Sequence, residues 1–415
     1  MTAEPATAEW SNWSGSVVCH PLRIETPASE AEITAIVRRA AEAGKAVRVA
    51  GSGHSFSPLC ATDGVLLSLD RWQGIETTGP GRVTDVAETE LVATIRAGTK
   101  IHDLGEPLRA AGMALENQGD VDVQALAGAI STGTHGTGPL LGSISTQVDA
   151  LRIVTATGDV VECSLQSDAE VFRAAQVSLG ALGVIVAVRM RLLPLYRLHE
   201  QCRGEPLDAC LTGLDQRMRA NRHFEFFWYP ADDCAFTKTL NPTDRPRFGA
   251  PLDAAAQASG LASAERERVD DSWRIFPTVR ENRFNEMEYS IPAERGVECF
   301  LEVRDLIRTK HRQATWPVEY RTVAADDILI SPAQGRATVA ISIHEGAALP
   351  HAAFFDDAEK IFRRHHGRPH WAKLHSLGRR ELAELYPEWE SFQAVRKRLD
   401  PDGRVLNEHL RRLFV

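Results

Sequence analysis

The sequence contains no apolar stretch long enough to cross a bilayer, and its start, "MTAEPATAEW", has neither the basic nor the apolar region of a secretion signal. Its seven cysteines are scattered without a CxxC pair, which argues against zinc and against a redox dithiol. Positive charge is not in excess, since the formal net charge is −9, and binding to a nucleic-acid backbone is therefore disfavoured. These absences predict a cytoplasmic protein with no transmembrane segment and no nucleic-acid partner.

The 415 residues, 43% of them hydrophobic, exceed what one core usually serves, so we expect two domains. The first half reads as mixed α and β. Residues 27–44 form a helix that opens on a capping box, Ser29 and Glu32. Further strands are predicted at 47–51, 64–70, 91–98 and 150–158, a helix at 101–112, and a helix, turn and buried strand across 168–190.

From about residue 191 the pattern changes to strands that alternate polar and apolar residues, which is typical of an antiparallel sheet with one solvated face. These strands are predicted at 223–230, 284–292, 316–323 and 337–345. Residues 239–275 are rich in Pro, Ala, Asp and Arg and weakly periodic, so we expect a surface insertion or mobile loop there.

Two segments rich in small residues could surround a phosphate. In "GSGHSF" (51–56) the glycines allow backbone N–H groups to converge, and the serines add hydroxyl donors. Residues 116–138, "ENQGDVDVQALAGAISTGTHGTG", offer a second such surface. Neither has the GxGxxG spacing of a Rossmann site or the lysine of a P-loop. The alternative is that both are structural turns, with His54 and His135 hydrogen-bonded locally.

Two strands could carry a charged surface. Alternation places Glu319 and Arg321 on one face of "VEYRTV", and Ser342 and His344 on one face of "ISIHE". If these strands are neighbours, a carboxylate, a guanidinium and an imidazole converge. The alternative is a polar sheet face in contact with water.

The run "HHGRPHWAKLH" (365–375) contains four histidines without the HExxH or paired Cys/His spacing of a metal site. We therefore predict no metal. Lys373, between Trp371 and His375, is better interpreted as a placed cation.

Taken together and in order, these stretches resemble the vanillyl-alcohol oxidase type of flavoprotein, and within it the aldonolactone oxidoreductases and alditol oxidases. The resemblance covers nearly the whole chain. It is carried by "WSNWSG", "GSGHSF", "LENQGDVD", "GTHGTG", "FEFF", "EMEY", "VEYR", "GRPHWAK" and "LNEHLRRLF".

The resemblance implies an α+β fold: an FAD-binding domain of two α/β subdomains (PCMH type) and a cap domain with a large antiparallel sheet. It implies an FAD-binding domain over 1–190, a substrate or cap domain over 191–375, and a C-terminal segment over 376–415 that returns to the first domain. It also implies that His54 bonds covalently to the flavin. The cofactor-binding residues would be Ala50, Gly51, Ser52, Gly53, His54, Ser55, Gly119, Asp120, Gly128, Ala129, Ile130, Ser131, Thr132, His135, Val184 and Ile185.

By the same resemblance Glu319, Arg321, His344 and Lys373 would be catalytic. Arg321 and Lys373 would stabilise negative charge on the reduced flavin, Glu319 would orient a sugar hydroxyl, and His344 could accept its proton, although the base is not settled. The implied substrate is L-gulono-1,4-lactone or a related sugar lactone, oxidised by hydride transfer to the flavin.

Two adjacent positions depart from the family pattern. Alditol oxidases carry Ala-Ser where this chain has Gly119 and Asp120, which weakens an alditol preference. A small residue at the first position leaves room for oxygen, yet similar dehydrogenases share it, so the acceptor is oxygen or another molecule. The alternatives are an alditol or carbohydrate oxidase and a non-catalytic flavin-binding sensor.

Overall fold

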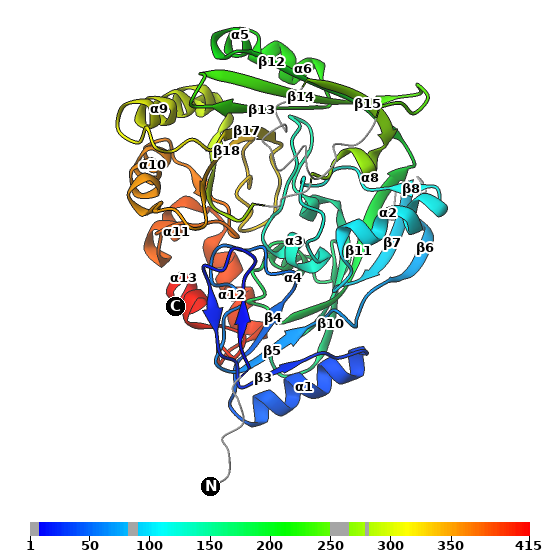
Figure 1. Ribbon diagram of the computed structural model, residues 1–415. Helices are drawn as coiled ribbons and strands as arrows, with labels where there is room; N and C mark the ends of the chain where they lie inside the picture. Colours follow the sequence, from blue (N-terminus) through cyan, green and yellow to red (C-terminus); the bar gives the residue numbers. More distant parts are fainter. Residues whose placement is uncertain (1–7, 82–89, 250–264, 279–281) are drawn as a thin grey trace.

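The computed structural model describes residues 8–81, 90–249, 265–278 and 282–415 (Figure 1). The chain begins with a small hairpin, β1 (Trp10–Ser11) and β2 (Val18–Cys19). A parallel sheet of three strands follows, in the order β3 (Arg23–Glu25), β5 (Val65–Ser68), β4 (Val47–Ala50). Its crossover helix is α1 (Glu30–Glu42), where the Ser29 hydroxyl accepts the Glu32 amide at 3.2 Å. The predicted N-cap at Ser29 is thus confirmed, but the reciprocal bond of a capping box is not formed, because the Glu32 carboxylate accepts the Ala28 amide at 2.8 Å instead of the Ser29 amide.

A second sheet has the order β10, β9, β11, β7, β6, and β8 pairs with β11. It is antiparallel throughout. The short helices of this half connect its strands and lie beside the sheet in Figure 1. The strands are β6 (Ile75–Gly81), β7 (Glu90–Arg96), β8 (Met113–Ala114), β9 (Val148–Val154), β10 (Val160–Ser164) and β11 (Val184–Pro194), and the helices are α2 (Ile101–Ala110), α3 (Leu126–Ser131) and α4 (Ala169–Ala175).

The second half forms an antiparallel sheet of eight strands in the order β15, β12, β14, β13, β17, β18, β16, β19. Helices α5 and α6 lie above it in Figure 1, and α9 and α10 pack against its β16 and β18 end. The strands are β12 (Arg197–Pro206), β13 (His223–Tyr229), β14 (Cys234–Thr243), β15 (Arg266–Asp271), β16 (Phe284–Pro292), β17 (Val318–Val323), β18 (Thr338–Gly346) and β19 (Arg368–Pro369). The helices are α5 (Leu207–Thr212), α6 (Leu214–Ala220), α8 (Ser272–Ile275), α9 (Gly296–Thr309) and α10 (Ala352–Arg364).

The chain ends with α11 (Arg379–Leu385), α12 (Trp389–Leu399) and α13 (Glu408–Phe414), which lie beside the N-terminal strands (Figure 1). Hydrogen bonds join the two ends: Arg48 Nη1 donates to the Val405 carbonyl at 2.6 Å, and Asn407 Nδ2 donates to the Ala61 carbonyl at 2.7 Å. These contacts support the predicted return of residues 376–415 to the first domain. The domain limits themselves stay a prediction.

Two expectations about the second half are wrong. Residues 239–249 and 265–275 are not an irregular insertion, because β14, β15 and α8 occupy most of them; residues 250–264 lie outside the described part. The polar sequence of β15 misled the prediction. Its Arg266 and Arg268 are paired with Glu200 of β12, and this pairing lets a charged strand join the edge of the sheet.

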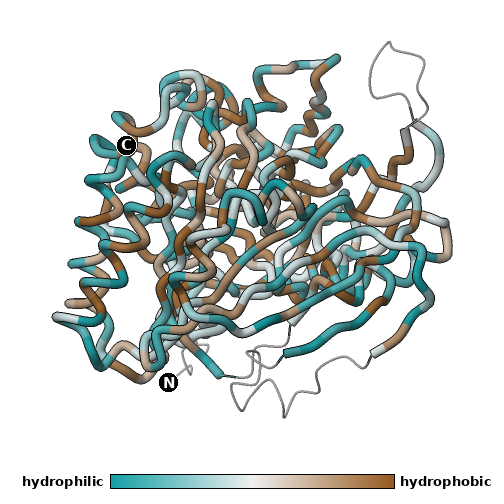
Figure 2. The backbone as a smooth tube through the Cα atoms, turned by 90° about the horizontal axis from the view of Figure 1, so that it is seen from above, coloured by the Kyte–Doolittle hydropathy of each residue, from teal (hydrophilic) through white to brown (hydrophobic). Residues whose placement is uncertain are grey.

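The expectation of one solvated sheet face is also wrong for the middle of this sheet. Every residue of β16 and β17 is buried. The sheet is antiparallel as predicted, but its polar face is covered by the first half of the molecule. Hydrophilic and hydrophobic residues alternate along much of the chain when it is viewed from above (Figure 2). Among the described helices, none combines the length and apolarity needed to span a membrane.

Candidate functional site

A cavity of about 1030 Å³ lies between the two small-residue segments. Its walls are β4 with the turn that follows, residues from Gln124 to Thr132, and residues from Leu179 to Ile185. The Ser52 hydroxyl donates to the Val123 carbonyl and so ties the first segment to the second. Gly53 has a φ of +70°, a conformation that favours glycine, and a Cβ on Gly51 would lie 3.0 Å from the Ala125 Cβ.

The lining of this cavity, largely backbone and small side chains, suits the close approach of a phosphate-bearing ligand. Gly128 is part of its wall, and a Cβ built on Gly128 meets nothing within 4 Å, so the backbone there is open to close approach by a ligand. The lining residues predicted from the sequence are Ala50, Gly51, Ser52, Gly53, His54, Ser55, Gly128, Ala129, Ser131, Thr132, Val184 and Ile185.

Four predicted cofactor residues lie elsewhere. Ile130 is 0% exposed and packs in the hydrophobic core, because it points to the opposite side of α3 from the cavity wall. Gly119, Asp120 and His135 line a second cavity of about 570 Å³. His54 and Gln124 line both cavities, so the two meet at these side chains.

The second cavity, which we call the charged cavity, contains all four predicted catalytic residues, Glu319, Arg321, His344 and Lys373. Strands β17 and β18 are indeed neighbours, with Glu319 opposite Ser342. The prediction that their polar side chains converge is confirmed. The alternative of a polar face in contact with water is wrong here, because Glu319 and Arg321 are buried.

Glu288, at 0% exposure, is the centre of this cavity's polar network. It receives hydrogen bonds from Arg321 Nη2 at 2.5 Å, His135 Nε2 at 2.9 Å and the Ser342 hydroxyl at 2.5 Å. Burial alone would raise the pKa of Glu288, but its electrostatic interactions with His135 and Arg321 outweigh burial and hold that pKa well below its usual range. Glu288 is therefore an ionised anchor for Arg321.

Glu286 forms a second, parallel arrangement. It is paired with Lys373 Nζ, and His344 Nε2 lies 3.5 Å from its Oε1. His344 Nδ1 donates to the Pro317 carbonyl at 3.0 Å. Burial would lower the pKa of His344, yet the Glu286 carboxylate outweighs burial and raises that pKa above its ordinary value. Both ring nitrogens thus face acceptors, which suits a proton donor better than a proton acceptor.

Glu319 behaves differently from these two glutamates. Its carboxylate lies 3.4 Å from Arg321 Nη2, which is shared with Glu288. Burial raises the pKa of Glu319 to about 7 against the opposing effect of Arg321, and the neighbouring Asp120 and Glu225 raise it further. Near neutral pH this carboxyl can therefore take up or release a proton, as a general base requires.

His54 stands between the two cavities with its ring stacked on Trp13, at a centroid distance of 5.1 Å. Burial, with added repulsion from Lys373 and Lys100, lowers the pKa of His54 to about 4. The ring is consequently neutral at physiological pH. A neutral imidazole has a nitrogen lone pair, the form that can act as a nucleophile.

Within the described part of the chain, two groups of side chains have atoms close enough to hold a metal ion: His135, Glu288 and His370 inside the cavity, and Glu298, Glu302 and His365 on α9 and at the end of α10. In the first group His370 Nδ1 accepts the Ala372 amide at 3.1 Å, so its other nitrogen carries the proton. Arg321 already occupies Glu288. These contacts disfavour a cation at that position.

Sequence reasoning did not assign Glu286, Glu288, His370, Gln124 or Trp13. The signal for the two glutamates was present, because alternation in "FNEMEYS" puts both on one face of β16. For His370 the signal was weaker, since four histidines lie within eleven residues. Its Nδ1 contact with the Ala372 amide depends on the local fold of the turn.

Comparisons with known proteins agree with this geometry. A family model described as D-arabinono-1,4-lactone oxidase matches residues 188–260 and 254–413, and one described as FAD binding domain matches residues 21–164. The second match includes both small-residue segments that form the first cavity. The residues present therefore fit FAD.

Relatives match along the whole chain. L-gulono-1,4-lactone dehydrogenase of Mycobacterium tuberculosis is 38% identical over 98% of this chain and 99% of its own length. L-gulonolactone oxidase of Bos taurus is 31% identical, with 98% of each chain covered, and alditol oxidase of a Streptomyces species is 28% identical over 97% of this chain and 98% of its own.

Among solved structures, a solvent-stable cholesterol oxidase superposes with a TM-score of 0.84 at 19% identity, covering 100% of this chain and 99% of that one. At this identity the likeness concerns the fold, and with the FAD-binding match it confirms the predicted fold class, a PCMH-type FAD-binding domain with a cap. The whole-chain relatives and the family model together decide the classification: the chain belongs to the D-arabinono-1,4-lactone oxidase family.

Proposed function

We propose that the protein is an FAD-dependent oxidoreductase that oxidises a hydroxyl-bearing carbon of an aldonolactone, L-gulono-1,4-lactone or a related sugar lactone. The observation that carries the proposal is the meeting of two cavities at His54 and Gln124. One is lined by small residues within the segment that matches an FAD-binding domain, and the other is lined by charged side chains suited to a polyhydroxylated substrate. The names of the whole-chain relatives supply the substrate class.

When bound, FAD supplies the chemistry of accepting a hydride from the substrate carbon. We propose that Glu319 takes the hydroxyl proton, because its pKa of about 7 makes it the titratable carboxyl of the cavity near neutral pH. His344 is the less suitable base, since its pKa is raised and both its ring nitrogens face acceptors. The sequence alone left the identity of the base open.

Arg321 and Lys373 are the proposed cations of the site. Each is held by a buried glutamate, Arg321 by Glu288 and Lys373 by Glu286. Fixed donors of this kind bind and orient hydroxyl oxygens and stabilise negative charge without having to reorganise. His54 would hold the cofactor by a covalent bond, which its neutral ring permits.

The alternatives lack a favouring observation. Asp120 lines the charged cavity where alditol oxidases are expected to have serine, and an alditol preference is not supported. A non-catalytic sensor would not need the buried Glu319 and the partly buried Lys373 close to the cofactor cavity. Electrons pass on to oxygen or to another acceptor, and the cytoplasmic location stays a prediction from the sequence.

The test is anaerobic reduction. Purified protein should be yellow, and L-gulono-1,4-lactone without oxygen should bleach the flavin absorbance. Admission of air, or of an artificial acceptor, should restore the absorbance and identify the class of acceptor. Protein that binds flavin but is bleached by no lactone or polyol would overturn the proposed reaction and favour the sensor.

A further inference from the structure

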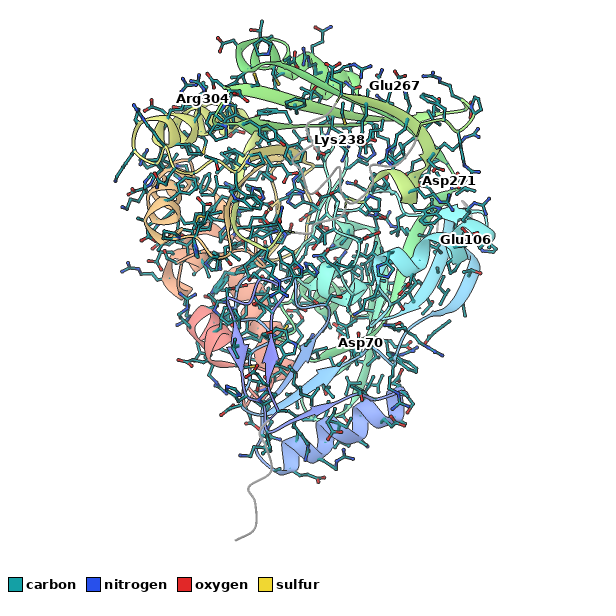
Figure 3. The ribbon with its side chains drawn as sticks, viewed as in Figure 1. Asp70, Glu106, Lys238, Glu267, Asp271 and Arg304 are labelled. Carbon is teal, nitrogen blue, oxygen red and sulfur yellow. The ribbon has the colours of Figure 1, made fainter. Side chains whose placement is uncertain are left out.

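A third, smaller cavity lies behind the charged cavity, under β13 and β14 of the large sheet. We call it the rear chamber. Asp120 and Arg321 line both spaces and separate them. The far side of the rear chamber is formed by Lys238, whose place beneath the large sheet is labelled in Figure 3, with its ion-pair partner Glu225 at 3.0 Å.

The rear chamber is lined by buried polar atoms that lack a hydrogen-bond partner among the described residues. They are His223 Nε2, Asn117 Oδ1 and Arg321 Nε. His223 is 1% exposed and Asn117 is 2% exposed, so bulk water does not satisfy them. Buried polar atoms are nearly always hydrogen-bonded. Three such atoms without a partner among the described residues, around one cavity, indicate an occupant that can donate and accept hydrogen bonds.

The protonation of His223 defines what that occupant must offer. Its Nδ1 donates to the Thr137 carbonyl at 2.9 Å, which leaves a bare lone pair on Nε2. Burial lowers the pKa of His223 to about 3, so the ring stays neutral. The chamber therefore presents two acceptors, His223 Nε2 and Asn117 Oδ1, and one donor, Arg321 Nε. A hydroxyl group both donates and accepts, and it matches this set.

We propose that the rear chamber is a hydroxyl-binding subsite that receives the exocyclic hydroxyl groups of the sugar lactone. This inference rests on the proposed function. A six-carbon 1,4-lactone has two exocyclic hydroxyls and a five-carbon 1,4-lactone has one, so the subsite discriminates between lactones by side-chain length. Ordered water is the other source of the same hydrogen bonds, and the experiment separates the two.

The test compares wild type, His223→Leu and the matched control His223→Gln, which keeps an acceptor near Nε2. The substrates are L-gulono-1,4-lactone, its 6-deoxy analogue and D-arabinono-1,4-lactone. In wild type, removing the 6-hydroxyl should lower kcat/KM about tenfold, as expected for loss of a hydrogen bond to a buried acceptor. His223→Leu should lose a similar factor on the six-carbon lactone and little more on the deoxy analogue. His223→Gln should recover most of the loss.

The proposed subsite is overturned if the effect of His223→Leu and the effect of removing the 6-hydroxyl are independent of each other. If His223→Leu lowers kcat/KM equally for all three lactones, or if the 6-deoxy penalty persists in full in that variant, the chamber holds water alone. Should His223→Leu fail to fold, judged by its thermal unfolding midpoint and flavin content, Asn117→Leu takes its place. A 6-deoxy penalty below about twofold in wild type overturns the subsite whatever the variants do. Wild type that oxidises none of the lactones instead overturns the proposed function.

Discussion

The two cavities that meet at His54 are built in opposite ways. The cofactor cavity is formed largely by backbone and small side chains from three short segments of the first half. The charged cavity gathers titratable groups from β16, β17, β18, the turn at 370–373 and the loop at 119–120. The first cavity is lined by small side chains, so a ligand can approach the backbone. The second pairs Arg321 and Lys373 each with a buried glutamate, so its geometry depends on charge balance in a poorly solvated space.

We expect the largest effect on this charge balance from a substitution of Arg321. Arg321→Ala leaves Glu288 with one fewer cationic partner, and removing one member of a buried pair typically costs about 3 to 5 kcal/mol. We expect kcat/KM to fall by roughly a thousandfold or more, since a fixed cation in a buried site contributes several kcal/mol to transition-state stabilisation. Steady-state kinetics and denaturant unfolding measure the two effects.

Arg321→Lys is the matched control, because it keeps the charge but loses the planar guanidinium that reaches Glu288 and Glu319 together. It should recover stability more than activity. Activity of Arg321→Ala within tenfold of wild type would contradict the role assigned to this residue.

In the cofactor cavity the corresponding test adds a large side chain to the wall instead of removing a charge. Gly128→Leu should fold, because no atom lies within 4 Å of a Cβ there and leucine has a higher helix propensity than glycine. The new side chain would fill space needed by the ligand, so we expect flavin content to fall at least about tenfold. The ratio of flavin to protein absorbance measures it. A full flavin load in this variant would show that the cofactor does not pass close to Gly128.

The charged cavity also differs from the cofactor cavity in containing Glu319, whose ionisation changes near neutral pH. As a base it must be ionised, so kcat/KM should rise as pH increases through about 7, and Glu319→Gln should remove that ionisation and lower kcat/KM by roughly a hundredfold. The contribution of Glu319 to the stability of the fold changes with pH in the opposite direction. A carboxyl whose folded pKa is raised stabilises the fold below its unfolded pKa and loses that contribution as pH rises through the folded value.

Glu319→Gln should therefore stabilise the protein relative to wild type more at pH 8 than at pH 5. Thermal unfolding midpoints at the two pH values measure this difference. A pH profile that keeps the same inflection in Glu319→Gln would assign the base to another residue.

The smallest expected effect is at the junction. His54→Ala removes the proposed tether and the stacking on Trp13 but leaves both cavities intact. We expect a folded protein whose flavin is released into the supernatant on acid precipitation, with activity lowered about tenfold. Flavin released from wild type under the same conditions would rule out covalent attachment. Loss of soluble protein in the variant would indicate a structural role.

Local pattern predicted one cavity better than the other for a physical reason. The turn at Gly51 and Gly53, and the small-residue segment that includes Gly128, are visible in sequence because backbone approach demands small residues at adjacent positions. Alternation also placed Glu319 and Arg321 on one face. It could not show that this face is buried, because burial depends on the first half of the chain covering the sheet.

Charged residues produced the main errors. The sequence "RERVDD" of β15 is polar enough to suggest a loop, yet it forms a strand since Glu200 of β12 pairs with its arginines. Ile130 shares a motif with residues that line the cofactor cavity but faces the core, because α3 directs neighbouring side chains to different sides. For β15 the deciding partner, Glu200, lies far away in sequence.

By itself the sequence determined the family resemblance, the order of motifs, the flexible backbone of the two small-residue segments and the pairing of opposite charges within single strands. Only the tertiary structure decided that Glu286 and Glu288 each hold a different cation, that Glu319 is the carboxyl with a pKa near neutrality, and that unpaired atoms of His223 and Asn117 border a rear chamber. Burial and distance set these properties, because a charge or a lone pair acquires its energy from the groups around it in space rather than from its neighbours along the chain.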